Sequence, residues 1–288
     1  MMLKELLKFL CNYKPAIRLF LKYKAAYCEN FMLVNDLKRE VPIIISLSST
    51  EKHFKYLEYT LCSIQNQKVK PDRVILWLSN EYELSELPYC ITKYIKNGLE
   101  IKFVEECSSF TKIIYALKEF KNSILITAED DIYYQKTWLA RLYHSYISSP
   151  RDIHVHKAHK IIATNDLTDY KKWGKYINDE DSSYTIFPLN AGGILYPPNC
   201  FSREVFRDDI YRKKTKIEWD LWAWFMSLVA NRKIRVVKNH IKYLNCINIF
   251  ERLINYIKAY RRHNNINKQI YFLMKYYGQN INQKMNTK

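Results

Sequence analysis

Four short apolar runs in the first half of the chain alternate with segments of helical periodicity. The runs span residues 42–49, 73–79, 99–104 and 123–127, and the helical patterns cover residues 54–64, 89–95 and 113–120. Strands and helices that alternate at this spacing favour a mostly parallel sheet with helices on both faces. Because crossovers between parallel strands are right-handed, we expect the ends of these strands to lie on one rim of the sheet.

We expect three parts in the chain. A basic amphipathic helical extension is predicted over residues 1–40, an α/β domain over 41–238, and a basic helical tail over 239–288 with one long helix at 249–277. Within the α/β domain, the polar and aromatic segment 166–184 is typical of a loop. It could act as a lid, with Tyr170, Trp173 and Tyr176 closing over a site.

Composition excludes several classes of protein. Only 5 of the 288 residues are Gly, and neither G-x-G-x-x-G nor G-x-x-x-x-G-K occurs, so a glycine-rich phosphate loop is excluded. The 7 Cys residues are dispersed without a C-x-x-C pair, which argues against a disulfide framework or a zinc site and fits a reducing cytoplasm. Basic residues break every apolar run near the N-terminus, so we expect neither a signal peptide nor a membrane span.

The positive charge is concentrated near the C-terminus. Of the net charge of +17, residues 231–288 contribute +12, from 13 Lys and Arg residues against the single acid Glu251. Such a tail suits nucleic acid or an anionic membrane surface. The basic amphipathic pattern of residues 1–40 suits a membrane interface, but a helix packed on the core with a solvated basic face gives the same pattern.

Three consecutive carboxylates follow the fourth apolar run. Glu129, Asp130 and Asp131 repel one another, and folding alone gives no reason to place them together. A divalent cation removes this repulsion, and hard oxygen ligands suit Mg²⁺ or Mn²⁺. Ligands of α/β sheets also bind at the carboxyl ends of strands. Two interpretations stay open: a metal site for a phosphate-bearing ligand, or a solvated acidic start of a helix near Gln135.

Asp220 is a second candidate. It lies between Trp219 and Trp222 near the start of a strongly aromatic helical pattern, residues 218–228. Indole rings partly desolvate a carboxylate, and this raises its pKa toward the range of a general base. The alternative is an acid placed near a helix N-terminus by the helix dipole.

A Gly-Gly pair and a lysine are weaker candidates. Gly192 and Gly193 could let the backbone approach a ligand, or could form a tight turn before a strand. Lys112 precedes a helical pattern and could pair with a phosphate or with the acidic triplet, although a solvated helix start is the commoner situation for a single Lys.

A histidine cluster suggests contact with a substrate. His154, His156 and His159 form an H-x-H-x-x-H pattern. Catalytic zinc sites usually add a more distant ligand and a carboxylate, so we favour substrate contact by His156 or His159 over a metal site.

Together these segments resemble the GT-A glycosyltransferases, specifically bacterial family 2-like transferases of surface polysaccharide and lipopolysaccharide assembly. The resemblance covers roughly residues 42–237. It is carried by IIISLSS (43–49), PDRVILWLS (71–79), FTKIIYALKEF (110–120), ITAEDDIYYQKTWLARLY (126–143), HKAH (156–159), AGGILYPP (191–198) and WDLWAWFMS (219–227). In that family a D-x-D-type motif after the fourth strand binds a divalent metal that holds the donor's diphosphate, and a later carboxylate deprotonates the acceptor. Here 90 residues separate Asp130 from Asp220.

The resemblance implies a role for each candidate. Glu129 and Asp131 match the metal-binding acids of the motif, and Asp220 matches the general base. Contact with the nucleotide-sugar donor is expected from Lys112, Asp130 and Ser46. Contact with the acceptor is expected from Gly192, Gly193, Trp219, Trp222, His156 and His159.

The resemblance also implies a reaction. A sugar moves with inversion from a nucleotide-diphosphate donor to a hydroxyl of a saccharide or lipid-linked acceptor, in the manner of a hexosyltransferase. Mn²⁺ or Mg²⁺ neutralises the leaving diphosphate, and Asp220 takes the acceptor proton. We expect a cytoplasmic protein, or a peripheral one at the inner face of the cell membrane.

Two other functions fit parts of the sequence. A nucleic-acid-binding protein or nuclease would use the basic tail. That charge lies outside the βα core, however, and no nucleic-acid-binding module is present, so no nucleic acid is expected as a partner. A catalytically weak, membrane-docked partner within a polysaccharide complex would use the same tail without transfer.

Overall fold

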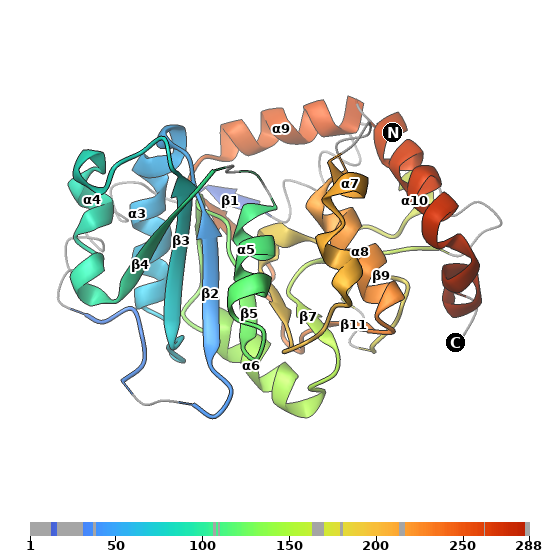
Figure 1. The fold of residues 1–288 in the computed structure, drawn as a ribbon, viewed down its shortest axis with the longest axis horizontal. Coiled ribbons are helices and arrows are strands. Elements are labelled where there is room, and N and C mark those ends of the chain that lie inside the picture. Colours follow the sequence, from blue (N-terminus) through green and yellow to red (C-terminus); the bar gives the residue numbers. More distant parts are fainter. Residues whose placement is uncertain are drawn as a thin grey trace.

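A seven-stranded sheet organises the fold (Figure 1). The computed structural model describes residues 13–15, 31–36, 39–105, 108, 110–162, 170–178, 181–212, 217–261 and 263–285. The strand order is β11-β7-β10-β5-β2-β3-β4, and β10 runs antiparallel to both of its neighbours, whereas the other pairs in this sheet are parallel. The predicted α/β architecture with a mostly parallel sheet is therefore confirmed.

The four predicted strands form one half of this sheet. They are β2 (Ile43–Ser48), β3 (Arg73–Ser79), β4 (Leu99–Val104) and β5 (Ile124–Thr127). Nearly all side chains of β2, β3 and β5 are buried because helices cover both faces, which explains why these strands are continuous apolar runs. The other half consists of β7 (Ile153–Val155), β10 (Ile194–Tyr196) and β11 (Ile234–Val236).

Helices cover both faces of the sheet (Figure 1). One face packs against α3 (Glu51–Gln65), α4 (Tyr89–Thr92) and α6 (Trp138–Ser148), and the other against α5 (Thr111–Glu119), the short α7 (Asp208–Tyr211) and α8 (Trp219–Val229). A two-stranded sheet of β8 (Ala158–Lys160) and β9 (Ile186–Pro188) extends the second layer.

A small second sheet has the order β1-β12-β6 and lies beside the acidic triplet. It contains β1 (Tyr13–Pro15), β12 (Leu244–Cys246) and β6 (Ile132–Tyr133). The predicted N-terminal helix is wrong at Tyr13–Pro15, which pair in parallel with β12, and at residues 31–36 and 39–40, which are irregular. Proline suits the edge of a sheet but not the interior of a helix. The rest of residues 1–40 lies outside the described residues.

The predicted helical tail of residues 239–288 is helical from Ile249 onward, in two helices instead of one, but it is wrong for residues 239–248, which are not helical and contain β12. α9 (Ile249–Arg261) is followed by α10 (His263–Met285), which buries Ile270, Leu273 and Ile281 against the core beside α8. Figure 1 shows α9 along the upper edge of the molecule, above the ends of the central strands. In the part of the chain that the structure describes, every helix is too short or too polar to cross a bilayer.

The predicted lid segment packs on the core. Trp173 is buried, with its ring 5.1 Å from that of Phe187 and 6.4 Å from that of Trp224. Because its indole is an interior side chain of the second layer, Trp173 does not close over the cavity described below. Residues 163–169 and 179–180 of this segment lie outside the described residues.

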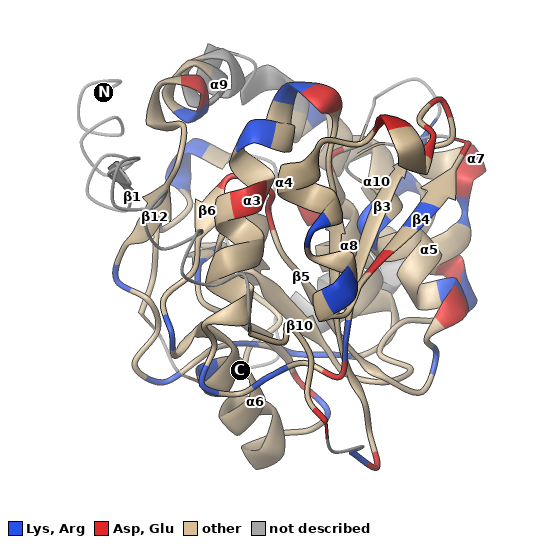
Figure 2. Ribbon diagram, turned by 90° about the vertical axis from the view of Figure 1, so that its left-hand side faces the viewer, with Lys and Arg blue, Asp and Glu red and all other residues tan. Residues whose placement is uncertain are grey.

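Acidic and basic residues are mixed on the face that carries α3, α4 and β4 (Figure 2). Ion pairs such as Lys93–Glu58 and Lys102–Glu119 lie there. This agrees with a charge of only +5 on residues 1–230, since +12 of the total +17 belongs to residues 231–288.

Candidate functional site

The acidic triplet lies where the chain passes from the large sheet to the small one. β5 ends at Thr127, the N–H of Ala128 still donates to the carbonyl of Ser46 on β2 (3.1 Å), and β6 begins at Ile132. The three carboxylates therefore occupy a short link that is fixed at both ends by strand pairing, on the rim where the parallel strands end. The predicted position at the end of the fourth strand is confirmed.

Glu129 is held by a cation and an amide. Its Oε1 accepts from Nζ of Lys112 on α5 (2.8 Å) and from Nδ2 of Asn190 (2.5 Å). Burial raises the pKa of the Glu129 carboxyl, but the positive charges of Lys112 and Arg252 outweigh burial, so the pKa lies below its usual value. Glu129 is thus ionised at neutral pH.

Asp130 is held by the start of α3. Its Oδ2 accepts from Oγ of Ser49 (2.6 Å), and its carboxylate lies 3.1 Å from Nδ1 of His53. Burial opposes ionisation of Asp130, but the bonds from His53 and Ser49 outweigh it and lower its pKa. The hydrogen bond to Asp130 in turn raises the pKa of His53 to about 9, so the imidazole is protonated at neutral pH.

Asp131 is held by α9. The guanidinium of Arg252 donates to both carboxylate oxygens, from Nε to Oδ2 at 2.7 Å and from Nη2 to Oδ1. The carbonyl of Asp131 also accepts from the N–H of Ile247 (2.9 Å), directly before α9. A two-point bond to arginine is both strong and specific in direction.

The donor set fits a divalent cation. One ligand oxygen from each of Glu129, Asp130 and Asp131 can be chosen so that all lie within 4.8 Å of one another. Carboxylate oxygens are the ligands that Mg²⁺ and Mn²⁺ prefer. In the described structure Lys112, His53 and Arg252 compensate the three negative charges, one cation for each carboxylate.

Asp220 lies in the first turn of α8 and lines the same cavity as Glu129. Its Oδ2 accepts from the backbone N–H of Asn190 at 3.3 Å. Burial raises the pKa of Asp220 to about 7; the bond from Asn190 lowers it, and the charge of Glu129 raises it further. The predicted upward shift is confirmed, and it places the pKa in the range useful for a general base.

Asn190 connects the two acidic groups. Its side chain donates to Glu129 and accepts from Oγ1 of Thr127 at the end of β5 (2.9 Å), while its backbone N–H donates to Asp220. It begins a 3₁₀ turn, Asn190–Gly192, which leads into β10. Asn190 therefore fixes the position of Asp220 relative to the triplet.

A cavity of about 770 Å³ lies between these groups. Its polar lining includes Glu129, Asn190, Asp220 and Arg252. Its aromatic wall consists of Phe110, Tyr211 and Trp219; the rings of Phe110 and Tyr211 stack at 4.5 Å, and Trp219 meets Phe110 edge to face at 5.3 Å. The cavity thus offers carboxylates at two points and an aromatic surface between polar groups.

Lys112 and Ser46, two of the residues predicted to contact the donor, are both buried but have different partners. Lys112 is buried beside Glu129, with Nζ also 3.2 Å from the carbonyl of Ala128. Ser46 has no exposed surface; its Oγ donates to the carbonyl of Lys112 and accepts from Nε1 of Trp77 (2.8 Å). Ser46 therefore fixes the start of α5, the helix that carries Lys112.

The predicted Gly-Gly pair allows close packing within the protein. A Cβ on Gly193, whose φ is +80°, would lie 2.6 Å from the Trp138 ring, and one on Gly192 would lie 2.9 Å from Cγ of Lys157. Nε1 of Trp138 donates to the carbonyl of Gly192 (2.8 Å). Both glycines are buried next to Asn190, behind the cavity wall.

The remaining predicted acceptor contacts, apart from Trp219, lie in the interior. Nε2 of His156 bonds the carbonyl of Trp138 (3.0 Å), and burial lowers the pKa of His156 to about 3. Nδ1 of His159 accepts from the N–H of Tyr176 (3.1 Å). Trp222 is fully buried and donates to the carbonyl of Val205 (3.0 Å).

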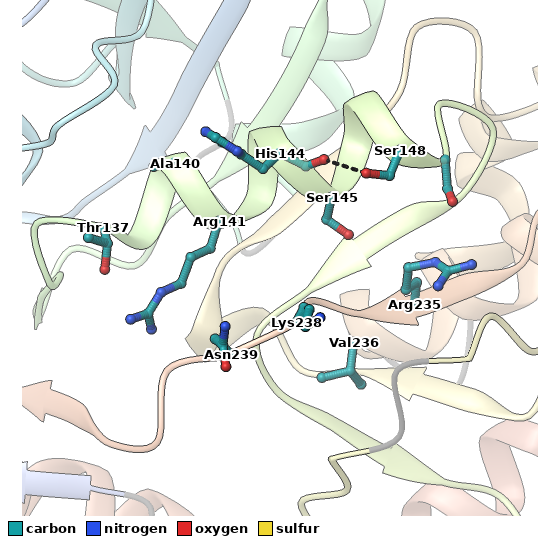
Figure 3. A pocket seen from close by; sticks show the side chains of 11 residues that line it. Thr137, Ala140, Arg141, His144, Ser145, Ser148, Arg235, Val236, Lys238 and Asn239 are labelled. Atoms are coloured by element: carbon teal, nitrogen blue, oxygen red, sulfur yellow. Dashed lines mark hydrogen bonds between the residues drawn. The ribbon is translucent and has the colours of Figure 1, made fainter.

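A second cavity, of about 730 Å³, lies between α6 and the end of β11 (Figure 3). Cationic side chains line it from both sides, Arg141 from α6 and Arg235 and Lys238 from β11 and the residues after it. Its lining includes none of the predicted site residues, and it is separate from the cavity that contains Asp220.

The residues that sequence reasoning missed are His53, Asn190 and Arg252. Asn190 directly precedes the predicted AGGILYPP segment, so its polar side chain beside a Gly-Gly pair was an available signal. His53 and Arg252 lie in ordinary helical sequence far from the triplet, and no local pattern distinguishes them.

Comparison with known proteins gives similarity at the level of structure only. No protein-family model and no curated protein matches the sequence. Among 97 matching chains of solved structures is S. aureus TarS, residues 1–349, with 15% identity, a TM-score of 0.48, and coverage of 83% of this chain and 72% of that chain. Another is the mannosyltransferase PcManGT from Pyrobaculum calidifontis, in complex with GDP-Man and Mn²⁺, with 10% identity and a TM-score of 0.45. The match covers 79% of this chain and 63% of that one.

Proposed function

We propose that this protein is a GT-A-type glycosyltransferase that moves a sugar from a nucleotide-diphosphate donor to a hydroxyl group, with inversion. One observation carries the proposal: Asn190 bonds Glu129 with its side chain and Asp220 with its backbone, across one cavity. Glu129 of a metal-type acidic cluster and a carboxylate with a pKa of about 7 thus line the same cavity. An inverting transfer from a diphosphate donor can use the first to stabilise the leaving group and the second to deprotonate the acceptor.

Glu129 and Asp131 would hold a divalent cation, with Asp130 beside them. When bound, that ion supplies positive charge to the leaving diphosphate. Lys112 lies against Glu129 and adds a fixed positive charge behind the triplet. The donor's diphosphate therefore belongs at the triplet end of the cavity.

Asp220 would act at the other end as the general base. The acceptor hydroxyl donates its proton to a carboxylate oxygen of Asp220 while its oxygen forms a bond to the anomeric carbon. The bond from that carbon to the diphosphate oxygen breaks on the opposite face, and its electron pair leaves with the nucleoside diphosphate. Trp219 and Phe110, in the aromatic wall of the cavity, provide apolar surface for the sugar rings.

A panel of nucleotide sugars, screened by thermal unfolding with and without Mn²⁺, tests this proposal. We expect one donor to raise the melting temperature, and Mn²⁺ to enlarge that shift, because a ligand that binds only the folded state stabilises it. Transfer or slow hydrolysis of the same donor should follow. A metal-dependent nuclease would instead cleave a phosphodiester and show no preference among sugars; that result would refute the proposal.

A further inference from the structure

Arg252 bonds carboxylate oxygens that a bound cation would also need as ligands. It rises from the first turn of α9 and donates to both oxygens of Asp131, the carboxylate that we assign to the metal. It also lines the cavity between the triplet and Asp220. One guanidinium is therefore within reach of both the metal ligand and the space for the donor.

The backbone around Arg252 is fixed, so its side chain is the part that can move. Oδ1 of Asn248 accepts from the N–H of Glu251 (3.3 Å), and Nδ2 of Asn248 donates to the carboxylate of Glu251 (2.7 Å) and to Oη of Tyr56 (3.0 Å). This reciprocal cap fixes the start of the helix. The N–H of Ile247 bonds the carbonyl of Asp131 and fixes the same turn to the triplet.

The charge at the triplet is already compensated in the described structure. Lys112, His53 and Arg252 each face one carboxylate. A divalent cation would add two positive charges next to these three. Arginine cannot relieve that repulsion by losing its proton, because its guanidinium stays protonated in proteins. Movement of the guanidinium away from Asp131 would relieve the repulsion, and the cavity that Arg252 lines is the space next to it.

We propose that Arg252 is a counter-charge that exchanges partners: it neutralises Asp131 while the metal site is empty, and turns to the donor's diphosphate when a divalent cation takes Asp131. The inference rests on the proposed function and adds to it how binding of the metal and binding of the donor depend on each other. Arg252 opposes binding of the metal alone and favours binding of the diphosphate to the metal-loaded protein. Metal and donor binding are then coupled through one side chain, and such coupling is reciprocal.

The test measures two affinities that should change in opposite directions. Binding of Mn²⁺ alone is followed by loss of the free-ion electron paramagnetic resonance signal, and binding of UDP and of GDP to the Mn²⁺-loaded protein by calorimetry. For Arg252→Gln we expect Mn²⁺ to bind about tenfold more tightly or better, within the usual range of coupling between sites. The better-bound diphosphate should then bind the metal-loaded variant at least about tenfold more weakly.

Two further variants make the result decisive. Arg252→Lys keeps the charge but loses the two-point bond, so its Mn²⁺ affinity should lie between those of the natural protein and Arg252→Gln. Lys52→Gln removes an exposed cation that pairs with Glu251 and not with the triplet, and it should leave both affinities unchanged. A damaged site would weaken both ligands together, which separates damage from exchange.

Each remaining outcome overturns the inference in a distinguishable way. If Arg252→Gln binds Mn²⁺ as the natural protein does, or more weakly, Arg252 does not compete with the metal, and the proposed metal site stands without it. If neither protein binds Mn²⁺, the metal dependence in the proposed function fails together with the inference.

Discussion

At the scale of single residues, the site keeps one carboxylate ionised and raises the pKa of another, and Asn190 bonds both. Glu129 is kept ionised by Lys112, whereas Asp220 is kept easily protonated by burial, although Asn190 bonds both carboxylates. Different environments thus separate the pKa values of two nearby acids, which is how sites assign a charged role to one and a proton-transfer role to the other.

Replacing Asp220 by Asn tests the assigned base. We expect the rate of transfer to fall by about 100- to 10,000-fold, the usual contribution of general-base catalysis. In the natural protein the rate should rise with pH and level off above about pH 7, because the base must be deprotonated, and Asp220→Asn should lose that rise. Rates are measured across pH at saturating donor. Asp208→Asn, an exposed acid on α7, is the matched control; unchanged kinetics in Asp220→Asn would remove the assignment.

The same substitution has a consequence for stability that does not depend on activity. The pKa of Asp220 is raised in the folded state, so the stability that this group contributes is present at low pH and lost as pH rises through about 7. Asp220→Asn, which carries no charge, should therefore gain stability relative to the natural protein as pH rises. Urea unfolding on both sides of neutral pH measures the difference, and an effect of the opposite sign would contradict the burial of this carboxyl.

At the scale of secondary-structure elements, the entry into β10 combines a tight turn with the close packing of α6. Gly193 has a φ of +80°, and an added Cβ would lie within 2.6 Å of the rigid Trp138 ring. At Gly192, which has no positive φ, an added Cβ would lie 2.9 Å from Cγ, 3.1 Å from Cβ and 3.1 Å from the backbone N of Lys157. An added Cβ is therefore more strongly strained at Gly193 than at Gly192.

Gly193→Ala should cost more stability than Gly192→Ala. Strained backbone and overpacking each cost on the order of 1–3 kcal/mol. We expect Gly193→Ala to lose at least that much, and Gly192→Ala to lose less, because only Gly193 combines a positive φ with a contact to a rigid ring. Chemical unfolding of the two variants measures this order. Equal losses would mean that the Trp138 contact does not limit this turn.

Buried histidines on and next to β7 make the fold sensitive to acid. Burial lowers the pKa of His156 to about 3, below its ordinary value of 6.5, so the stability from the neutral ring is complete above about pH 6.5 and lost as pH falls toward 3. The natural protein should lose about 2–3 kcal/mol from this group between about pH 6.5 and 4.5. His156→Gln should show a shallower loss of stability with acid than both the natural protein and His144→Gln, at an exposed position of α6. Identical acid unfolding in all three would contradict it.

Elements whose signals are local were predictable from the sequence. The strands β2, β3 and β5 appear as apolar runs because they are short and mostly buried, and the edge strand β4 appears as a short run of alternating apolar and polar residues. The triplet and Asp220 stand out as clustered acids and as an acid among indoles. β1 has only three residues and depends on pairing with β12, more than 200 positions away along the chain. Arg252 likewise reaches the triplet only because the cap at Asn248 and the backbone of Ile247 bring α9 there.

At the scale of the whole molecule, the basic tail carries both the positive charge and exposed apolar side chains. On α9, Phe250 is 76% exposed and Ile254 51%, one helical turn apart and on the helix that supplies Arg252 to the cavity. Residues 231–288 carry +12. Exposed apolar groups within a basic segment are typical of helices that bind anionic membranes. Docking through α9 would hold the cavity near the membrane surface.

Combined substitution of Phe250 and Ile254 by Ser tests docking without unfolding the tail. Truncation is unsuitable, because α10 buries Ile270, Leu273 and Ile281 in the core. We expect the natural protein to sediment with vesicles that contain anionic lipid, and added salt to weaken this binding because it screens the tail's charge. The double variant should lose at least about tenfold in affinity, since about 0.8 kcal/mol is lost for each methylene group withdrawn from the lipid and the two side chains withdraw more than two. Ile147→Ser, an exposed apolar residue on α6, is the control. If the double variant binds as tightly as this control, α9 is not the docking element, and the tail's charge must act elsewhere.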